Sequence, residues 1–281
     1  MTSALVARGL RSCSALAVLA FCVPPLASAE PVPVRHVEGT LHGFLTLSSQ
    51  DGKLLATGDL IQTARGQRVT SRLVFRFKDG SVDDETTVYS ERGSFRLIRD
   101  RHIQRGPFFP HPMDLSIDAR SGQVTVRSTG KDGKEEVQTE HLDLPPDLAN
   151  GLVLSIAKNL PPDAPETKLP FVVATPKLRL VTLRIVAGAE EPFSIAGSRR
   201  KAMRYDIKVE LGGVTGLVAP LVGKQPPDLH IWILEGEAPA FVKEEGFTFE
   251  GGPTLTIQLT SPVWPKSPDA RIVKPDARIV K

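Results

Sequence analysis

The sequence predicts an all-β fold with one short helix, in which a curved antiparallel sheet or half-barrel wraps around a single helix. Apolar residues recur at every second position through most of the chain after residue 35, as in strands with one face on a core and one face in water. Glycine-containing turn motifs separate these stretches at short intervals, which is typical of hairpins. One amphipathic segment interrupts the pattern.

The first 29 residues have the composition of a secretory signal peptide: a cationic end, a short apolar core, and small residues before the cleavage point. The apolar core is shorter than the roughly 20 residues that span a bilayer. We therefore expect cleavage after Ala29 and a periplasmic or secreted protein with no transmembrane segment in the mature chain. A lipid anchor at Cys22 is disfavoured, because Phe21 stands where bacterial lipoprotein signals have a small residue.

Cysteine content and charge exclude several classes of function. Cys13 and Cys22 are removed with the signal peptide, so the mature chain has no disulfide, catalytic thiol or thiolate metal site. The formal net charge is +3, and two of these positive charges belong to Arg8 and Arg11 of the signal peptide. Nucleic-acid-binding domains are usually basic on one face, so we expect no nucleic-acid partner.

The first part of the mature chain, residues 35–143, is predicted to form a meander of hairpins. Alternation is clearest in "QRVTSRLVFRFK", where one face is predicted to consist of Val69, Ser71, Leu73, Phe75 and Phe77. Asp-Gly and other glycine pairs supply the positive-φ positions of tight turns. Turns are expected at residues 50–53, 65–67, 78–81, 91–94, 120–123 and 131–134.

A helix is expected over residues 146–160, where the period changes. Its apolar stripe consists of Leu148, Leu152, Ile156 and Leu160, which are four residues apart. A helix this short needs to pack on the sheet to be stable.

A second set of strands is expected within residues 169–260. The predicted strands are 169–175, 178–187, 202–211, 229–235 and 254–260. The segments "LRLVTLRIVAG" and "LHIWILEG" are apolar on both faces, which predicts a central position in the sheet. Residues 30–265 are thus interpreted as a single β-rich domain.

The last residues, 266–281, contain the heptapeptide "PDARIVK" and a repeat of it. Two interpretations remain open. The doubled "ARIV" can add a strand to the sheet edge of another chain, or the segment is a disordered extension of the kind that termini tolerate. We expect the disordered extension.

No catalytic, nucleotide-binding or metal-binding motif is present in the sequence, so we expect no enzyme, no catalytic residues and no cofactor. His102 and His111 flank "IQRGPFFP" and could converge with Asp100 or Asp114 on a metal. Metal sites normally draw on three or four convergent ligands. We therefore expect no metal site, and ordinary surface histidines instead.

Two stretches of the sequence are rich in charged residues. Asp83, Asp84 and Glu85 are consecutive, so a strand sends neighbours to opposite faces, and we expect a solvated hairpin end. Arg99 and Arg101 share a predicted face with Leu97. If that face continues inward, the two arginines lie at the mouth of a cavity, where a guanidinium holds a carboxylate or phosphate. If it does not, they pair with Glu85 and Asp84 across the hairpin.

Arg99, Arg101 and Trp232 are the candidate ligand-binding residues. Trp232 belongs to the segment "LHIWILEG", which is apolar on both faces.

The layout resembles that of uncharacterised exported bacterial proteins of the lipoprotein-carrier-like, half-barrel type. The shared features are a signal peptide, a hairpin meander, "LDLPPDLANGLVLSIAKNL" after a Leu-Pro-Pro step, and strands that end in "TIQLTSPVWP". The resemblance implies a curved sheet around a hydrophobic cavity with a helical lid, and some members bind acyl chains. This sequence has one helix only, so lipoprotein transport is not implied.

These features predict a non-enzymatic periplasmic protein that binds an apolar, amphipathic or lipid-like molecule in a β-sheet cavity. The alternative is a structural or assembly module that contacts another envelope protein through a sheet edge or the C-terminal tail. A third hypothesis is a hydrolase with a dispersed acid site at Asp84, Glu85 and His102.

Overall fold

The computed structural model describes residues 31–130, 133–174, 178–195, 198–210 and 227–260. The predicted signal peptide with both cysteines, and the predicted tail at 266–281, lie outside the described residues. Within the described part, no helix has the length and apolar character needed to cross a membrane.

The described chain forms one antiparallel sheet of 14 strands and one short helix, which confirms the predicted fold class. The elements are β1 (Leu41–Ser49), β2 (Leu54–Arg65), β3 (Arg68–Phe77), β4 (Val82–Ser90), β5 (Arg96–Arg105), β6 (Met113–Asp118), β7 (Gln123–Thr129), β8 (Glu135–His141), α1 (Val153–Ala157), β9 (Thr167–Val173), β10 (Arg179–Ile195), β11 (Ser198–Glu210), β12 (Leu229–Leu234), β13 (Ala240–Gly246) and β14 (Leu255–Thr260).

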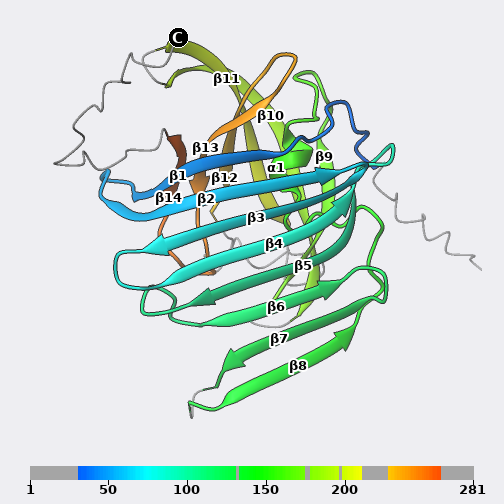
Figure 1. Ribbon diagram of the computed structural model, residues 1–281, viewed down its shortest axis with the longest axis vertical. Helices are drawn as coiled ribbons and strands as arrows, with labels where there is room; N and C mark the ends of the chain where they lie inside the picture. Colours follow the sequence, from blue (N-terminus) through cyan, green and yellow to red (C-terminus); the bar gives the residue numbers. More distant parts are fainter. Residues whose placement is uncertain (1–30, 131–132, 175–177, 196–197, 211–226, 261–281) are drawn as a thin grey trace, which may run out of the picture.

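The sheet is open and strongly curved. Its strand order is β8-β7-β6-β5-β4-β3-β2-β1-β14-β13-β12-β11-β10-β9, so β8 and β9 are the two edge strands. The first and last parts of the chain meet where β1 pairs with β14. Figure 1 shows β1–β8 stacked as one broad layer, with β10–β12 running steeply behind them and α1 close to β9. The coarse half-barrel layout that the resemblance implies is therefore present.

The predicted hairpin turns of the meander are confirmed. Each connects two consecutive strands among β1–β8, and each contains a glycine with positive φ, which L side chains adopt at a cost. These glycines are Gly52, Gly66, Gly80, Gly93, Gly122 and Gly133. Part of the last turn, residues 131–132, lies outside the described residues.

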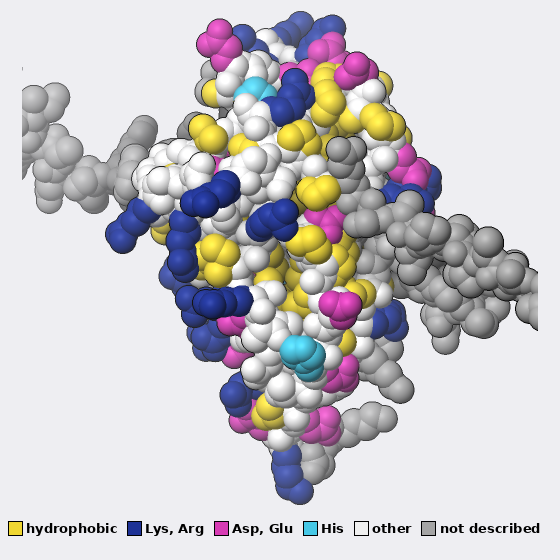
Figure 2. Space-filling model, turned by 90° about the vertical axis from the view of Figure 1, so that its right-hand side faces the viewer, with side chains coloured by type: hydrophobic (Ala, Val, Ile, Leu, Met, Phe, Trp, Pro, Cys, Tyr) yellow, Lys and Arg dark blue, Asp and Glu magenta, His cyan; other side chains and the backbone are white. Residues whose placement is uncertain are grey.

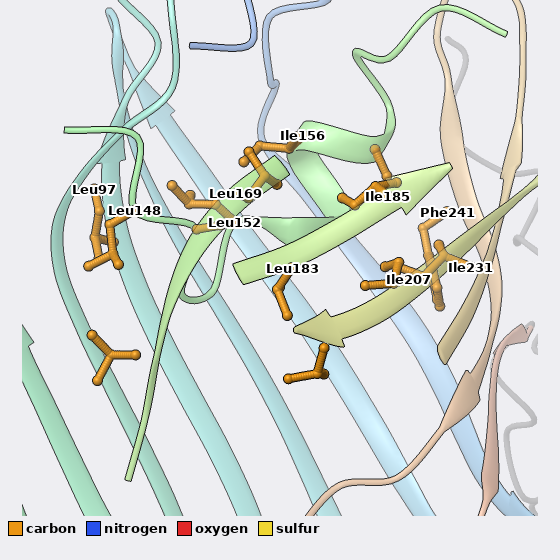
Figure 3. Close-up of a cluster of buried hydrophobic side chains, with 14 of the residues drawn as sticks. Leu97, Leu148, Leu152, Ile156, Leu169, Leu183, Ile185, Ile207, Ile231 and Phe241 are labelled. Atoms are coloured by element: carbon orange, nitrogen blue, oxygen red, sulfur yellow. The ribbon is translucent and has the colours of Figure 1, made fainter. Parts of the chain in front are cut away.

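A continuous apolar core fills much of the concave side of the sheet. On β3, Val69, Phe75 and Phe77 are buried in this core, as the alternation predicts. The core also includes residues of β9–β12 and of residues 146–160, which we call the helical segment. In Figure 3, Leu97 and Leu148 lie together at the left, Ile207, Ile231 and Phe241 lie together at the right, and Ile156 of α1 lies between the two groups.

The predicted helix over 146–160 is wrong in its length: the α-helix spans only Val153–Ala157. Gly151 has a φ of +64°, which an α-helix cannot contain. Before it, the chain forms turns, and part of it bonds to the edge strand β9. Ala149 N–H donates to the carbonyl of Pro170, and the Asn150 side chain exchanges two hydrogen bonds with Val172. The apolar stripe is nevertheless buried as predicted.

Hydrogen bonds connect the helical segment to β4 in the first half of the sheet and to β11 in the second half. The Tyr89 hydroxyl lies 3.1 Å from Ser155 Oγ, and the Tyr205 hydroxyl donates to the carbonyl of Leu160 at 2.9 Å. Tyr89 belongs to β4 and Tyr205 to β11. The side-chain oxygen of Asn159 accepts two backbone N–H bonds from the segment before β1, both at 2.7 Å. The helix is thus held in place from three directions.

A buried ion pair adds to this anchoring. Lys158 pairs with Glu38, and their side chains are 13% and 7% exposed. Gln62 donates to the second carboxylate oxygen of Glu38 at 2.9 Å, and Glu91 accepts the backbone N–H of Glu38 at 3.0 Å. Such a network is costly to break because a removed partner leaves a charge in a poorly solvated site.

The prediction that both two-sided apolar strands lie centrally is wrong for β10, which lies beside the edge strand β9. Its outward residues Leu180 and Val186 are 38% exposed. In β12, a second small cluster on the outer side explains the apolar character of both faces. That cluster consists of Ala202, Trp232 and Val242, with Phe193 and Leu234 packed against it. Strand β13, with its sequence "AFVKEEG", lacks clear alternation and was not predicted.

Candidate functional site

The concave side of the sheet is not completely filled. A cavity of about 800 Å³ lies between the inner face of the sheet and the helical segment, within the range of small-molecule sites in proteins. Apolar side chains from distant parts of the chain line much of it, including Leu73, Leu154, Phe171, Ile207, Ile231 and Phe241. Figure 2 shows apolar side chains gathered in the middle of the face that lies at the right of Figure 1.

One region of the cavity wall is polar because of a β-bulge in β5. Leu97 pairs with Tyr89 and Arg99 pairs with Val88, so Ile98 is an extra residue in the ladder. An inserted residue exchanges the faces of the strand from that point onward. Leu97 is therefore inside before the bulge, and Asp100 lines the cavity after it. His102 and Gln104 follow Asp100 on the same inner face.

The neighbouring strand β4 completes this polar region. Asp83, Glu85 and Thr87 line the cavity and stand opposite Gln104, His102 and Asp100 respectively. The expectation of a solvated hairpin end at Asp83–Glu85 is wrong, since two of these three carboxylates lie on the inner face. Only Asp84 lies outward, where it accepts a bidentate bond from Arg72.

Short hydrogen bonds hold the polar side chains together. His102 Nε2 lies 2.6 Å from Asp83 Oδ1, and Gln104 donates to Asp83 Oδ2 at 3.1 Å. Thr87 Oγ1 donates to Asp100 Oδ1 at 2.8 Å. Gln104 also donates to the carbonyl of Thr248 at 2.7 Å, which ties this wall to the loop after β13.

A further carboxylate reaches the cavity from the opposite part of the sheet. Trp232 pairs with Lys243 and Ile233 pairs with Phe241, so Val242 is the extra residue of a second bulge. After the bulge, Glu244 lines the cavity and stands opposite Ile231 in the ladder. The two bulges therefore bring Asp100 of β5 and Glu244 of β13 into the space that the carboxylates of β4 already line.

Burial and neighbouring charges shift the pKa values of this cluster. Burial raises the pKa of Asp100 to about 8, with the charge of Glu85 adding to the effect, and burial raises the pKa of Glu244 to about 7. Burial also raises the pKa of Glu85. For His102, burial lowers the pKa, but the hydrogen bond and charge of Asp83 outweigh this and raise it to about 9. At neutral pH the cluster holds protons that an unfolded chain would release.

These shifts predict that the protein loses stability as pH rises. For Asp100 and Glu244, the folded pKa values of about 8 and about 7 exceed the ordinary values of 3.8 and 4.5. For His102 it is about 9 against 6.5. Each stabilising contribution is complete below the unfolded pKa and is lost as pH rises through the folded one, so the free energy of unfolding should fall by a few kcal/mol from about pH 5 to about pH 9.

Urea unfolding at a series of pH values measures this slope. Asp100→Asn should flatten it, because the amide oxygen still accepts from Thr87 but no longer titrates. Asp114→Asn is the matched control, since Asp114 pairs with Arg101 on the solvent side and should leave the slope unchanged. A stability that is constant or rises over this range would contradict the protonation described for the cluster.

The structure places the predicted site residues outside the cavity. Arg99 and Arg101 are exposed, and Arg101 forms a bidentate pair with Asp114 of β6. Their inward placement was wrong because it assumed unbroken alternation through Ile98. The second alternative also chose the wrong partners, since Arg101 pairs with β6 rather than with β4.

Trp232 lies in the outer cluster, where its indole N–H donates to Glu191 at 2.8 Å and Lys243 stands 4.3 Å from the ring centre. It is not among the residues that line the cavity.

His102 does not converge with His111 on a metal. Its partner is Asp83, while Asp114 faces outward. His102 is also no ordinary surface histidine, because its side chain is only 22% exposed. Within the described residues, no three His, Cys, Asp or Glu side chains are arranged to hold a metal ion.

The residues that sequence reasoning missed are Asp83, Asp100, Gln104 and Glu244. Asp100 was considered only as a metal ligand. A signal was available in the segment "FRLIRDRHIQ", where Leu97 and Ile98 are adjacent apolar residues and the charge pattern changes after them. Two adjacent apolar residues inside an alternating strand are compatible with a bulge.

Comparison with known proteins gives a distant similarity in fold. No protein-family model matches the chain, and no curated protein matches its sequence. Among solved structures, the chain is similar to a β-barrel-like protein of a domain of unknown function (DUF1849) from Brucella abortus. The TM-score is 0.44 and the identity 12%, over 80% of this chain and 98% of that chain.

Proposed function

We propose that the protein binds an amphipathic or apolar molecule in the cavity, outside the cytoplasm and without chemical conversion. The observation that supports this proposal best is the cavity of about 800 Å³ with its largely apolar lining. Empty apolar volume costs stability because its lining lacks packing partners. A guest that fills the space supplies these contacts.

The lining itself supports an amphipathic guest. Leu60, Leu73 and Leu154 are only partly buried although they stand on the concave side, so they offer apolar surface to a guest. The polar cluster of β4 and β5 supplies a small number of hydrogen-bonding groups in the same space. Binding sites commonly combine an apolar wall with a few such groups.

Leu73→Trp should fill part of the cavity and weaken the binding of alkyl-chain probes. The indole is larger than the side chain it replaces and projects from the middle of β3. We expect the affinity for a fluorescent dodecyl probe to fall by about tenfold or more, which corresponds to roughly 1.4 kcal/mol of lost contact. Fluorescence titration measures the change.

Thr70→Trp is the matched control, because Thr70 lies on the exposed face of the same strand. This variant should bind like the unmodified protein. Equal binding by Leu73→Trp, or failure of the unmodified protein to bind any alkyl probe, would contradict the proposal.

Assembly with an envelope protein is the second candidate function. Strand β8 stands at one end of the sheet, and six of its seven residues are exposed, which is the situation of a strand that pairs with a partner. Its glutamates Glu135, Glu136 and Glu140 argue against this function, because charged side chains on an edge strand discourage pairing with another chain. Val137→Pro on β8 should abolish a partner contact seen by crosslinking if this candidate is correct, and should leave alkyl-chain binding unchanged.

A further inference from the structure

We propose that the preferred guest is a cationic amphiphile, in which an apolar chain bears a protonated amine or another positively charged head group. This inference rests on the proposed function and adds the chemistry of the head group. The head group lies among the carboxylates of β4, β5 and β13. The chain lies along the apolar wall formed by β9–β12 and the helical segment.

The first support is the balance of charge in the cavity wall. Asp83, Glu85, Asp100 and Glu244 are four acidic side chains in this region, and His102 is the one basic side chain among them. Lys158 also lines the cavity, but its ammonium is paired with Glu38. His111 and Glu250 complete the ionisable lining within the described residues. Once these acidic side chains are ionised, a positive head group offsets their charge, whereas a negative one adds to it.

The second support is the presence of buried polar atoms without partners. Asp100 is 3% exposed, and its Oδ2 atom has no hydrogen-bond partner in the described structure. Thr248 Oγ1, which also lines the cavity, is buried without a partner as well. Buried polar atoms in native proteins are almost always hydrogen-bonded. An ammonium head group has several N–H donors and no acceptor, which suits a wall of carboxylate oxygens.

The third support is the placement of Glu85 and Glu244. Neither carboxylate forms a hydrogen bond or ion pair with another described residue. The charge of His102 attracts Glu85, and the charges of Asp83 and Glu244 repel it. Glu85 and Glu244 come from opposite parts of the sheet, β4 and β13. A cation between them would convert a repulsive pair into two attractive contacts.

The same repulsion shows in the protonation of the cluster. Burial and neighbouring carboxylates raise the pKa values of Glu85, Asp100 and Glu244. A cationic guest has the opposite effect on these groups, so its binding should release protons and strengthen as pH rises. His102 loses its positive charge as pH rises through its pKa of about 9, which also strengthens the binding of a cation.

The test compares three probes with the same alkyl chain: dodecylammonium, dodecanol and dodecanoate. Isothermal titration calorimetry with the full mature chain should give an affinity for dodecylammonium about tenfold or more above that for dodecanol, since a charged hydrogen bond contributes about 1.5–3 kcal/mol. Dodecanoate should bind most weakly. Titrations in buffers with different ionisation enthalpies should show proton release with dodecylammonium.

Variants locate the effect. The double variant Glu85→Gln, Glu244→Gln should lose the preference for dodecylammonium over dodecanol while still binding dodecanol, and it should fold because it removes like charges. Asp84→Asn with Glu245→Gln is the matched control. These two carboxylates are sequence neighbours of the test pair, but they pair with Arg72 and Lys243 instead of lining the cavity.

The outcomes separate the inference from the proposed function. If dodecanol or dodecanoate binds as tightly as dodecylammonium, the head-group inference is wrong and the cavity remains a general apolar site. If the control double variant removes the preference as well, the effect comes from overall charge, and the inference is again wrong. If none of the three probes binds, the proposed function itself is wrong.

Discussion

Gly151→Ala should destabilise the protein by roughly 2–5 kcal/mol, the sum of left-handed backbone strain in a non-glycine residue and overpacking in a tight core. Gly151 has a φ of +64°, and a Cβ atom there would lie 1.9 Å from Thr87 Oγ1 and 2.9 Å from Asp100 Oδ1. The glycine thus lets the helical segment approach the polar wall of the cavity. Urea unfolding followed by circular dichroism measures the loss.

Gly66→Ala separates the two causes of this effect. Gly66 has a similar φ of +59°, but a Cβ atom there would have no neighbour within 4 Å. This control should cost only the backbone strain, about 1–2 kcal/mol. If the two variants lose the same stability, the close approach of Gly151 to β4 and β5 is contradicted.

Lys158→Met should cost about 3–5 kcal/mol, because it removes one partner of a buried ion pair and leaves the other charge uncompensated. Glu38 is 7% exposed and is already hydrogen-bonded to Gln62. The variant also loosens the contact between the helical segment and the chain before β1. The expected result is a lower midpoint of urea unfolding with the cooperativity retained.

Two further variants test this explanation. Lys168→Met is the control, since Lys168 is 51% exposed, and exposed ion pairs contribute about 0–1 kcal/mol. Adding Glu38→Gln to Lys158→Met should restore part of the lost stability, because the uncompensated charge is then absent. If the double variant recovers no stability, or if Lys158→Met loses less than about 1 kcal/mol of stability, the ion pair contributes little to the free energy of unfolding.

Local patterns were sufficient to predict the fold class and the meander. The period-two apolar face of "QRVTSRLVFRFK" and the glycines of the six turns depend on interactions between near neighbours in sequence. These features translate directly into β3 and its neighbouring hairpins. The buried stripe Leu148, Leu152, Ile156 and Leu160 was likewise predictable.

Part of the chemistry of the cavity depends on single inserted residues, and this part was not predicted. Ile98 and Val242 each shift the ladder by one position. A shift of one residue sends every later side chain to the other face. Unbroken alternation therefore allows Arg99 and Arg101 at the cavity mouth, whereas Asp100 and Glu244 are the residues that reach the cavity. Whether two adjacent apolar residues form a bulge is decided by the partner strand and the core.

Tertiary contacts also explain why the length of the helix and the positions of the strands that are apolar on both faces were not predicted correctly. The stripe in residues 146–160 allowed a long helix, but the hydrogen bonds of Asn150 to the edge strand β9 favour an irregular backbone before Val153. The apolar character of both faces of β12 comes from packing of Trp232 on the outer side rather than from a second covering layer. These contacts join residues far apart in sequence.

The most direct test of the account is a crystal structure of the mature chain with a bromine-labelled dodecylammonium. We expect one anomalous bromine peak inside the cavity, near Leu73 or Phe171, with the ammonium group beside Glu85 and Glu244. A structure in which side chains fill the concave side completely, or in which the bromine lies only on the outer surface, would contradict it.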